Sequence, residues 1–452
     1  MRTPWTDQTA LVIGAAASGQ AAAALLAGLG ARVRLYDRNP AAVAPPGVVP
    51  VFGAPSPPEP AYAGIDMLVL SPGVPPAAFL ADHARLAPRA AVHGEMSLSL
   101  AIADDRWGRL PTVLVTGTNG KSTVTALTGA LLSAAGWSPF VGGNLGIPLA
   151  AALMTSQRPD SLVLECSSFQ LETLAGTTVD VAMVLNLTPD HLDRYATLED
   201  YAATKARVFT DLAPDGLALL DGGDAWTPYF QARVPRGRTV LVDGTGPEGQ
   251  VASILGPGPG HTLALPGGER YARSALRLAG RHNSKNALFA LAAARHLGAA
   301  PEACAAGLAA FEGLPHRMVL VRELDGVTYY DDSKATNVAS VLASLDGFDR
   351  KVVLIAGGRA KGDDLAPLRA LLARAGAGLV AIGESTETFF AVGDGVVPTV
   401  RATSMPAAVA AARGLARPGD AVVLSPACAS YDWFKNYGER GDVFAACVYD
   451  LT

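Results

Sequence analysis

Residues 111–123 read Pro-Thr-Val-Leu-Val-Thr-Gly-Thr-Asn-Gly-Lys-Ser-Thr, an apolar run that leads into a glycine-containing turn and a Lys-Ser-Thr end. The apolar residues 113–115 predict a buried strand, and Val124, Leu127 and Leu131 recur at the spacing of a helix. At a strand–turn–helix junction, unpaired backbone N–H groups and the positive end of the helix dipole converge on an anion. The stretch therefore predicts a phosphate-binding loop.

Three side chains of this loop have an expected role in phosphate binding. Lys121 adds a positive charge, and the hydroxyl of Ser122 or Thr123 can hold a magnesium ion. The glycines lie at Gly117 and Gly120, whereas the usual P-loop would have its first glycine two residues before Gly117. A structural turn with an exposed lysine is the alternative, but the predicted strand and helix on either side favour the phosphate loop.

Composition limits the class of protein to which the chain can belong. At 452 residues it is long enough for about three domains. The net charge of −5 and the lack of Lys/Arg clusters argue against a nucleic-acid surface. The four cysteines lie far apart without metal-ligand spacing, which favours a reduced, cytoplasmic compartment.

The start of the chain is polar and lacks the layout of a signal peptide. The longest apolar run, near residues 21–29, is too short to cross a membrane. We therefore expect a cytoplasmic monomer that binds small molecules and neither nucleic acid nor membrane.

The first 100 residues predict a βαβ nucleotide-binding unit. A strand at Ala10–Gly14 enters a glycine-containing loop, and a second strand at Val33–Tyr36 ends in Asp37, where an acidic side chain meets ribose hydroxyls. Ala16 stands at the position of the middle glycine of the dinucleotide fingerprint. A diphosphate ligand other than a dinucleotide is therefore at least as well supported as NAD. A strand at 65–70 then ends at Ser71, which is either a ligand contact or part of a plain turn.

Three further polar side chains are expected at strand ends near the phosphate loop. Asn144 lies in the presumed loop 142–146, Glu165 ends an apolar strand at 161–165, and His191 follows another apolar strand at 181–187. A carboxylate beside a phosphate loop is where a magnesium ligand belongs. Together these strand ends predict a metal–phosphate site, although His191 alone could equally be a base or a turn residue.

Two helices carry polar residues whose roles the residues alone leave open. Lys205 lies on a predicted helix near Leu198–Leu212, where an isolated lysine is expected to be a solvated surface residue. Asn283 and Asn286 are three residues apart and share a helix face that could contact an adenine edge. Capping of the helix is the alternative for Asn283.

A third region follows Arg317, which is a candidate phosphate partner in a linker. Strands alternate with helices and predict a mostly parallel sheet, at 327–330, 351–355, 379–382 and 421–424. Their ends carry lysine and hydroxyl side chains that would suit a small dicarboxylate, although solvated loops explain any one of them equally well. We expect an α/β protein with an N-terminal Rossmann-like domain, a central P-loop-type ATPase sheet and a C-terminal Rossmann-like domain, at 1–98, 99–312 and 313–452.

Six strings of residues resemble the Mur ligase family. Four are general to it: Gly-Thr-Asn-Gly-Lys-Ser-Thr at 117–123, Glu165 with Ser-Ser-Phe-Gln-Leu-Glu at 167–172, Asp-His-Leu-Asp-Arg-Tyr at 190–195, and Gly-x-His-Asn-x-x-Asn-Ala at 280–287. Two resemble the members that add D-glutamate: Asp-Asp-Ser-Lys-Ala-Thr-Asn at 331–337 and Leu-Ser-Pro-Ala-Cys-Ala-Ser at 424–430. The sequence departs from the family pattern at Ala16, at Arg38-Asn39 after Asp37, and at Tyr437 in place of a Phe.

The resemblance implies an ATP-dependent amide ligase of peptidoglycan assembly. ATP would phosphorylate the L-alanine carboxylate of UDP-N-acetylmuramoyl-L-alanine, and the amine of D-glutamate would attack the acyl phosphate. ATP and two magnesium ions are the implied cofactors. The implied catalytic residues are Lys121, Glu165, His191, Lys205 and Lys334.

The resemblance also implies the binding residues. ATP would be held by Gly117, Thr118, Asn119, Gly120, Lys121, Ser122, Thr123, Asn283, Asn286, Arg317 and Asp332. Magnesium would be held by Ser122, Thr123, Glu165, His191 and a carbamylated Lys205. The UDP-sugar would meet Ser18, Asp37, Ser71, Asn144 and His191, and D-glutamate would meet Lys334, Thr336, Lys361, Ser430 and Tyr437.

Three other functions compete with this interpretation. A relative with the same fold could add another amino acid or extend folate with glutamate, against which the Lys334–Thr336 motif and the Lys361 loop favour a dicarboxylate. A dehydrogenase built on the first βαβ unit would leave the phosphate loop unexplained, and Ala16 weakens it. A non-enzymatic binding module would bind ATP and close its domains without turning the ATP over. The many polar side chains expected at neighbouring strand ends disfavour this alternative.

Overall fold

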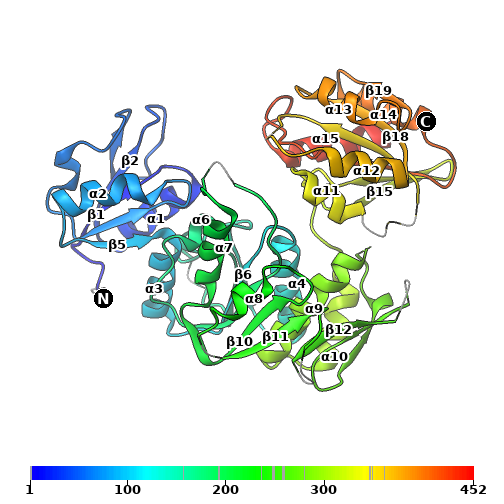
Figure 1. The fold of residues 1–452 in the computed structure, drawn as a ribbon. Helices are drawn as coiled ribbons and strands as arrows, with labels where there is room; N and C mark the ends of the chain where they lie inside the picture. The colour runs from blue at the N-terminus through cyan, green and yellow to red at the C-terminus, as the bar shows by residue number, and fades with distance from the viewer. Residues whose placement is uncertain are drawn as a thin grey trace. The chain divides into compact units, whose positions relative to one another are not determined.

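The computed structural model describes residues 3–155, 157–191, 194–235, 237–246, 250–256, 260–278, 280–345, 348, 350–360 and 362–452. The chain divides into two compact units, residues 1–273 with 286–310 and residues 274–285 with 311–452. Three sheets with flanking helices follow one another along the chain, from the blue N-terminus to the red C-terminus (Figure 1). The predicted α/β class with three parallel-rich sheets is confirmed.

The first sheet has the strand order β3-β2-β1-β4-β5, and all of its described pairs are parallel. Its strands are β1 (Thr9–Ile13), β2 (Arg32–Asp37), β3 (Val48–Phe52), β4 (Met67–Leu70) and β5 (Ala91–Gly94). Its helices are α1 (Ala17–Gly28), η1 (Glu59–Tyr62), α2 (Pro76–Leu86) and α3 (Glu95–Trp107). The strand order reverses between β1 and β4, and ligands of such sheets bind outside the carboxyl ends of the strands at this point.

The second sheet has the order β14-β13-β12-β11-β10-β9-β6-β8-β7. Its strands are β6 (Thr112–Thr116), β7 (Pro139–Gly143), β8 (Ser161–Glu165), β9 (Val179–Val184), β10 (Leu212–Asp221), β11 (Arg238–Val242), β12 (Val251–Leu255), β13 (Thr262–Ala264) and β14 (Arg270–Ala272). Its helices are α4 (Lys121–Ala134), α5 (Leu149–Ala152), α6 (Ser168–Leu171), α7 (Leu198–Ala206), η2 (Arg207–Phe209), α8 (Thr227–Gln231), η3 (Arg273–Ala275), α9 (Arg281–His296) and α10 (Pro301–Ala310). The described pairs are parallel from β7 to β12, whereas β12, β13 and β14 pair antiparallel.

The third sheet has the order β15-β16-β20-β17-β18-β19. Its strands are β15 (Val319–Leu324), β16 (Val327–Asp331), β17 (Val352–Gly357), β18 (Gly376–Ile382), β19 (Thr399–Arg401) and β20 (Ala421–Leu424). Its helices are α11 (Val338–Leu345), α12 (Ala366–Ala375), α13 (Thr386–Gly393), α14 (Met405–Leu415) and α15 (Tyr437–Tyr449). The edge strand β15 pairs antiparallel with β16, and the other described pairs are parallel.

Burial explains why the central strands are readable in the sequence. Val113, Leu114 and Val115 have no exposed surface, and β6, which carries them, is a central strand between β8 and β9. Strands covered on both faces are apolar throughout. The predicted helix after the phosphate loop is also confirmed, since α4 ends at Ala134 just before Gly136, whose φ is 86°.

Two local predictions were wrong. The helix expected to run to Leu212 ends at Ala206, and Leu212 instead starts β10 because its buried side chain packs there while its backbone pairs with Val179 of β9. Gly142 and Gly143, expected in a loop, are the last residues of β7 and pair with Leu164 and Glu165. None of the described helices has the length and apolar character needed to cross a membrane.

Candidate active site

The predicted phosphate loop connects β6 to the first turn of α4. Gly120 precedes the helix with a φ of 83°, a left-handed conformation that suits glycine, and no side chain caps the helix. A β carbon on Gly120 would lie 2.8 Å from Oδ1 of Asn286, so this asparagine lies directly beside the loop. The N–H groups at the start of α4 therefore have no side-chain cap to compete with an anion.

Asn186 braces this loop, and its role was missed in the sequence. Its Oδ1 accepts hydrogen bonds from the N–H groups of Thr118 (3.1 Å) and Asn119 (2.8 Å), and its Nδ2 donates to the carbonyl oxygen of Asn119 (3.0 Å). The Thr118 hydroxyl donates to the carbonyl of Thr188 (3.2 Å). A polar amide two residues after the buried strand β9 is the signal that could have identified Asn186, because β9 is a neighbour of β6.

Two lysine amines donate hydrogen bonds to carbonyl oxygens of this loop. Nζ of Lys121 donates to the carbonyl oxygens of Gly117 (3.0 Å) and Thr118 (2.8 Å), and Nζ of Lys205 donates to the Gly117 carbonyl at 2.9 Å. Lys205 is only 1% exposed, and its Nζ lies 4.5 Å from the ring centroid of Tyr201. The expectation from the residues alone, a solvated surface lysine, was wrong because this face of α7 packs inward.

The surroundings of Lys205 favour its neutral form. Burial lowers the pKa of its ammonium well below the ordinary value of 10.5, and the positive charge of Lys121 lowers that pKa further. Asp190, Cys166 and Glu165 act in the opposite direction. A neutral amine is a nucleophile, which an exposed lysine at neutral pH is not.

Glu165 ends β8 beside the loop and is 3% exposed. Its Oε1 accepts a hydrogen bond from Nδ2 of Asn144 at 2.5 Å, whereas its Oε2 is buried and has no hydrogen-bond partner in the described part of the chain. A buried carboxylate oxygen without a partner is costly unless a cation neutralises it. Glu165 therefore fits a metal ligand, and Asn144 orients it.

His191 lies in the turn after β9, with a positive φ of 55°. Its N–H donates to Oδ1 of Asp190 (3.0 Å), and its ring lies 4.8 Å from that of Phe169, centroid to centroid. The next two residues of the motif lie outside the described residues. Within the described residues, no group of three or more His, Cys, Asp or Glu side chains could hold a metal ion. This is compatible with magnesium, which typically takes one or two protein carboxylates and completes its shell with phosphate and water.

The first sheet places its predicted site residues around the loop between β1 and α1. Asp37 accepts hydrogen bonds from the N–H groups of Ala15 (2.7 Å) and Asn39 (2.8 Å), and the Ser71 hydroxyl donates to the carbonyl of Gly14 (3.0 Å). Ser18 is half-buried in the first turn of α1, which no side chain caps. Asp37 and Ser71 therefore bind the two sides of one peptide group, between Gly14 and Ala15, at the start of the loop.

The second unit brings most of its predicted residues to the carboxyl ends of β16 and β20. Asp332 is buried and accepts a hydrogen bond from the Ser425 hydroxyl (2.7 Å), and burial raises the pKa of Asp332 to about 7. Nζ of Lys334 lies 3.7 Å from the ring centroid of Tyr437. Ser430 is buried and Thr336 half-buried.

Arg440 cross-links the loops of this unit and was missed in the sequence. It is 1% exposed and donates to the hydroxyl (2.9 Å) and carbonyl (2.8 Å) of Ser333 and to the carbonyl of Cys428 (3.1 Å). The N–H of Ala427 donates to the carbonyl of Ala335 at 2.9 Å. Nothing in the local sequence distinguishes Arg440 from a surface arginine of a helix. Lys361 lies outside the described residues.

The remaining predicted residues lie close in sequence to the bounds of the second unit, which comprises residues 274–285 and 311–452. Asn283 is buried and lies two residues inside α9, so the helix-capping alternative was wrong. Arg317 is half-buried, and its charge acts on Asp332 to lower the pKa of that carboxyl against the effect of burial.

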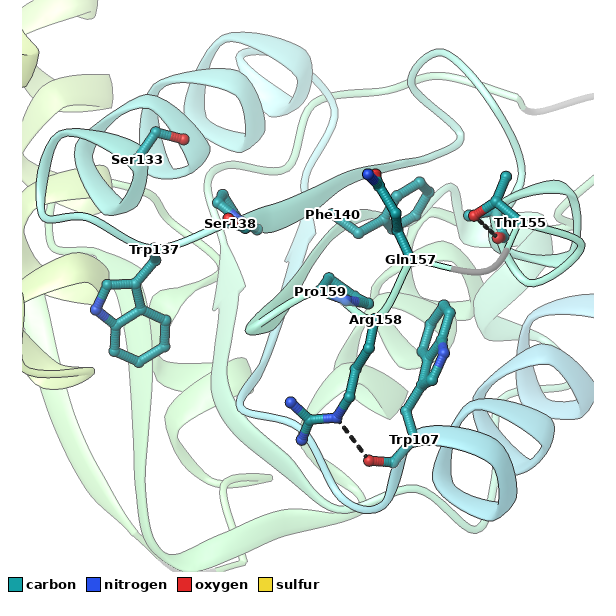
Figure 2. Close-up of a pocket in the computed structure, with 11 residues that line it drawn as sticks. Trp107, Ser133, Trp137, Ser138, Phe140, Thr155, Gln157, Arg158 and Pro159 are labelled. Atoms are coloured by element: carbon teal, nitrogen blue, oxygen red, sulfur yellow. Dashed lines mark hydrogen bonds between the residues drawn. The ribbon is translucent and has the colours of Figure 1, made fainter.

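The first unit has a pocket of about 590 Å³ (Figure 2). It lies at the amino ends of strands in the second sheet, away from the phosphate loop at their carboxyl ends. Trp107, Phe140 and Arg158 are among its lining residues, and Arg158 Nε donates to the Trp107 carbonyl at 2.9 Å. The amino ends concerned are those of β7 and β8, whereas parallel sheets bind ligands at the carboxyl ends. None of the predicted site residues lines the pocket.

Comparison with known proteins identifies the family. Residues 115–294 match the Mur ligase middle domain and residues 316–428 match the Mur ligase glutamate ligase domain. The chain is 41% identical to UDP-N-acetylmuramoylalanine–D-glutamate ligase of Chromobacterium violaceum, with 98% of each chain covered, and 43% identical to that of Anaeromyxobacter dehalogenans, with 96% of each covered. The chain belongs to the Mur ligase family.

Solved structures support the Mur ligase fold at low sequence identity. A pseudomurein peptide ligase type C from Methanothermus fervidus is similar at a TM-score of 0.62 and 17% identity, over 98% of this chain and 100% of that one. MurF ligase from Thermotoga maritima, solved in complex with ADP, is similar at a TM-score of 0.58 and 16% identity, over 84% of this chain and 95% of that one.

Proposed function

We propose that this Mur ligase joins D-glutamate to UDP-N-acetylmuramoyl-L-alanine at the expense of ATP in peptidoglycan precursor synthesis. The observation that carries the proposal is the match, at about 40% identity over nearly the whole length, to relatives that bear this activity in their names. The half-buried Lys121 and the buried Glu165 and Lys205 lie around one loop, which supports ATP-driven chemistry.

The reaction consists of two displacements. The alanyl carboxylate attacks the γ-phosphorus of ATP, which gives an acyl phosphate and releases ADP. The amine of D-glutamate then adds to the carbonyl carbon, and the tetrahedral intermediate loses phosphate and a proton to leave an amide. Neither step needs a covalent enzyme intermediate, so alignment of the reactants and neutralisation of charge are what the protein supplies.

The proposed roles of the loop residues follow from their placement. The N–H groups of residues 117–123 and the Lys121 ammonium would surround the ATP phosphates, so that Nζ of Lys121 exchanges its carbonyl partners for phosphate oxygens. Magnesium, when bound, supplies positive charge to the transferring phosphoryl group. Its proposed ligands are Glu165, His191, a hydroxyl of Ser122 or Thr123, and Lys205 in carbamylated form.

The proposal that Lys205 is carbamylated is supported by its burial and depressed pKa. A neutral amine adds to CO2 and releases one proton, which replaces a cation by a carboxylate. That carboxylate would lie near Glu165, whose buried Oε2 has no hydrogen-bond partner in the described residues. Mass spectrometry under native conditions with ¹³CO2 should detect the adduct on the wild type and not on Lys205→Met.

The proposed substrate contacts fall into three groups. Asn283, Asn286, Arg317 and Asp332 would hold the nucleoside and phosphates of ATP. The UDP-sugar would meet Ser18, Asp37, Ser71, Asn144 and His191, and D-glutamate would meet Lys334, Thr336, Lys361, Ser430 and Tyr437. We further propose that the enzyme is a monomer of the cytoplasm, which its free cysteines favour.

Phosphate release from ATP tests the proposed function. The assay contains UDP-N-acetylmuramoyl-L-alanine and, in parallel, D-glutamate, L-glutamate, other amino acids or none. Release that requires both the UDP-sugar and D-glutamate is the expected result. Release with a different amino acid would overturn the assigned substrate but keep the reaction class, and no release with any acceptor would contradict the ligase.

A further inference from the structure

Arg194 connects the second sheet to the first within the same compact unit. Its Nε and Nη2 donate to the two carboxylate oxygens of Glu172 at 3.1 and 2.6 Å, and Nη2 also donates to the carbonyl of Val74 at 3.1 Å. The side chains of the ion pair are only 15% and 13% exposed. A two-pronged ion pair of this kind fixes the plane of the guanidinium.

Aromatic rings hold the same guanidinium from the side of the second sheet. Cζ of Arg194 lies 4.9 Å from the ring centroid of Phe169, and that ring also contacts the ring of His191 at 4.8 Å. The Tyr195 hydroxyl donates to Oε1 of Glu172 at 2.9 Å, and the N–H of Arg194 donates to the carbonyl of His191 at 2.9 Å. The position of Arg194 is therefore tied to the turn that carries His191.

The other end of the connection is the turn after β4. The N–H of Val74 donates to the carbonyl of Ser71 at 3.0 Å, and the Ser71 hydroxyl donates to the carbonyl of Gly14 at 3.0 Å. A β carbon on Gly14 would lie 3.0 Å from Cγ2 of Val74, so the turn packs closely over the first glycine loop. Arg194 is thus bonded to a turn that contacts the loop around Gly14, which is the proposed UDP-sugar side of the site.

We infer that Arg194, oriented by Glu172, is a positioning residue that fixes the Ser71–Val74 turn relative to the His191 turn. The inference rests on the proposed function, in which one substrate extends from the first turn to the second. Its diphosphate end would meet the first sheet, and its carboxylate would have to reach the phosphate loop of the second. A small displacement between the two turns would misplace the reacting carboxylate.

Arg207 provides a matched control. Its Nε and Nη2 donate to the carbonyls of Leu171 (2.7 Å) and Leu174 (2.8 Å), so it anchors the same segment as Glu172. None of these hydrogen bonds reaches Val74 or His191. If Arg194 only stabilised the fold, its loss would resemble the loss of Arg207.

The experiment compares Arg194→Ala, Arg194→Lys, Glu172→Gln and Arg207→Ala in steady-state kinetics with each substrate varied separately, alongside thermal unfolding. For Arg194→Ala, we expect KM for UDP-N-acetylmuramoyl-L-alanine to rise about tenfold or more and KM for ATP to change less than about twofold. For Arg194→Lys, we expect KM for UDP-N-acetylmuramoyl-L-alanine to lie between those of the wild type and Arg194→Ala. An ammonium keeps the positive charge but cannot make the paired bonds to Glu172 and also reach Val74. Arg207→Ala should lower the unfolding temperature and leave both KM values within about twofold.

A double variant tests whether the ion pair acts as one unit. Arg194→Ala combined with Glu172→Gln should raise KM for the UDP-sugar no further than the worse single change. Equal rises in KM for ATP and the UDP-sugar, or the same kinetic pattern in Arg194→Lys and Arg207→Ala, would overturn the inference. If Arg194→Ala does not fold, the kinetics of Arg194→Lys and Glu172→Gln still test the inference. A wild type that releases no phosphate would instead contradict the proposed function.

Discussion

The two glycine loops of the first unit share a backbone design but differ in the charges around them. Each joins a buried strand to a helix that no side chain caps, β1 to α1 and β6 to α4. In the first loop, the Asp37 carboxylate accepts the N–H of Ala15. In the second, the neutral Asn186 amide accepts N–H groups, and two lysine amines bond to the Gly117 carbonyl.

From this difference we predict that neighbouring side chains, rather than the strand–loop–helix motif, decide which ligand each loop binds. A carboxylate beside the first loop repels phosphate near Ala15 and favours hydroxyl or N–H donors, as a ribose or a uracil offers. The second loop, with the Lys121 ammonium beside it, instead suits a triphosphate, whose negative charge needs neutralising. The predictions below test this contrast in order of decreasing effect.

Removal of the Lys121 charge should have the largest effect. Lys121→Ala should lower D-glutamate-dependent phosphate release by about a thousandfold or more, because no other described side chain replaces its ammonium at the loop. The unfolding temperature should change by only a few degrees. Lys351→Ala is the control, since Nζ of Lys351 also donates to a backbone carbonyl, that of Arg374 at 3.0 Å, but lies in no proposed site. Near-normal release in Lys121→Ala would contradict the cationic loop.

Close packing of the first loop should appear as a loss of stability on adding a single methyl group. A β carbon on Gly19 would lie 1.8 Å from the Gly14 carbonyl oxygen, whereas one on Gly28 of the same helix meets nothing within 4 Å. Gly19→Ala should therefore lower the free energy of unfolding by about 2–3 kcal/mol. Gly28→Ala should raise it by about 0.5 kcal/mol. Urea denaturation of both variants measures the difference, and equal effects would refute the close contact.

Glu95 lies at the start of α3, which follows the first sheet, and accepts a hydrogen bond from the Ser99 hydroxyl (3.2 Å). Burial raises the pKa of Glu95 from 4.5 to about 7. The folded state therefore binds the proton more tightly, and this stabilisation is present below pH 4.5 and is lost as pH rises through 7.

Glu95→Gln should therefore stabilise the protein at high pH. The gain should be on the order of 2 kcal/mol at pH 8 and should vanish near pH 4, because Gln mimics the protonated acid. Denaturation of wild type and variant across this range measures it. A difference that does not change with pH would show that Glu95 has an ordinary pKa.

Replacement of Lys205 should have opposite effects on stability and on activity. Its lowered pKa means that folding removes a proton at neutral pH, which costs free energy. In buffer without CO2, where Lys205 carries no carbamate, Lys205→Met should raise the free energy of unfolding at pH 7, and the gain should shrink as pH rises toward 10. Phosphate release should nevertheless be lost. A destabilised variant that still turns over would contradict the assigned role.

Much of the fold could be predicted from the sequence because buried parallel strands are uniformly apolar. The strands at 161–165 and 421–424 were placed at their observed bounds for this reason. The edge strands β3 and β15 were missed, because Pro50 in β3 and the charged Arg322 and Glu323 in β15 interrupt the apolar pattern. The start of β10 at Leu212 was assigned to a helix, because its apolar residues continue the helical spacing of the preceding segment.

The candidate site was predictable where its residues end apolar strands and not where they act from helices. Glu165 follows directly from its place at the end of β8. Lys205 could be recognised only by family resemblance, because burial of a helix face is a tertiary property. Arg440 was missed for the same reason, since its partners Ser333 and Cys428 are distant in sequence.

The most direct test of the account follows oxygen from the alanyl carboxylate. UDP-N-acetylmuramoyl-L-alanine labelled with ¹⁸O in that carboxylate is incubated with ATP, magnesium and D-glutamate, and the released phosphate is analysed by mass. An acyl phosphate formed at the Lys121–Glu165 site predicts one ¹⁸O atom in each phosphate released with the amide product. Unlabelled phosphate would mean that water, and not the carboxylate, attacks ATP, and would contradict the ligase mechanism.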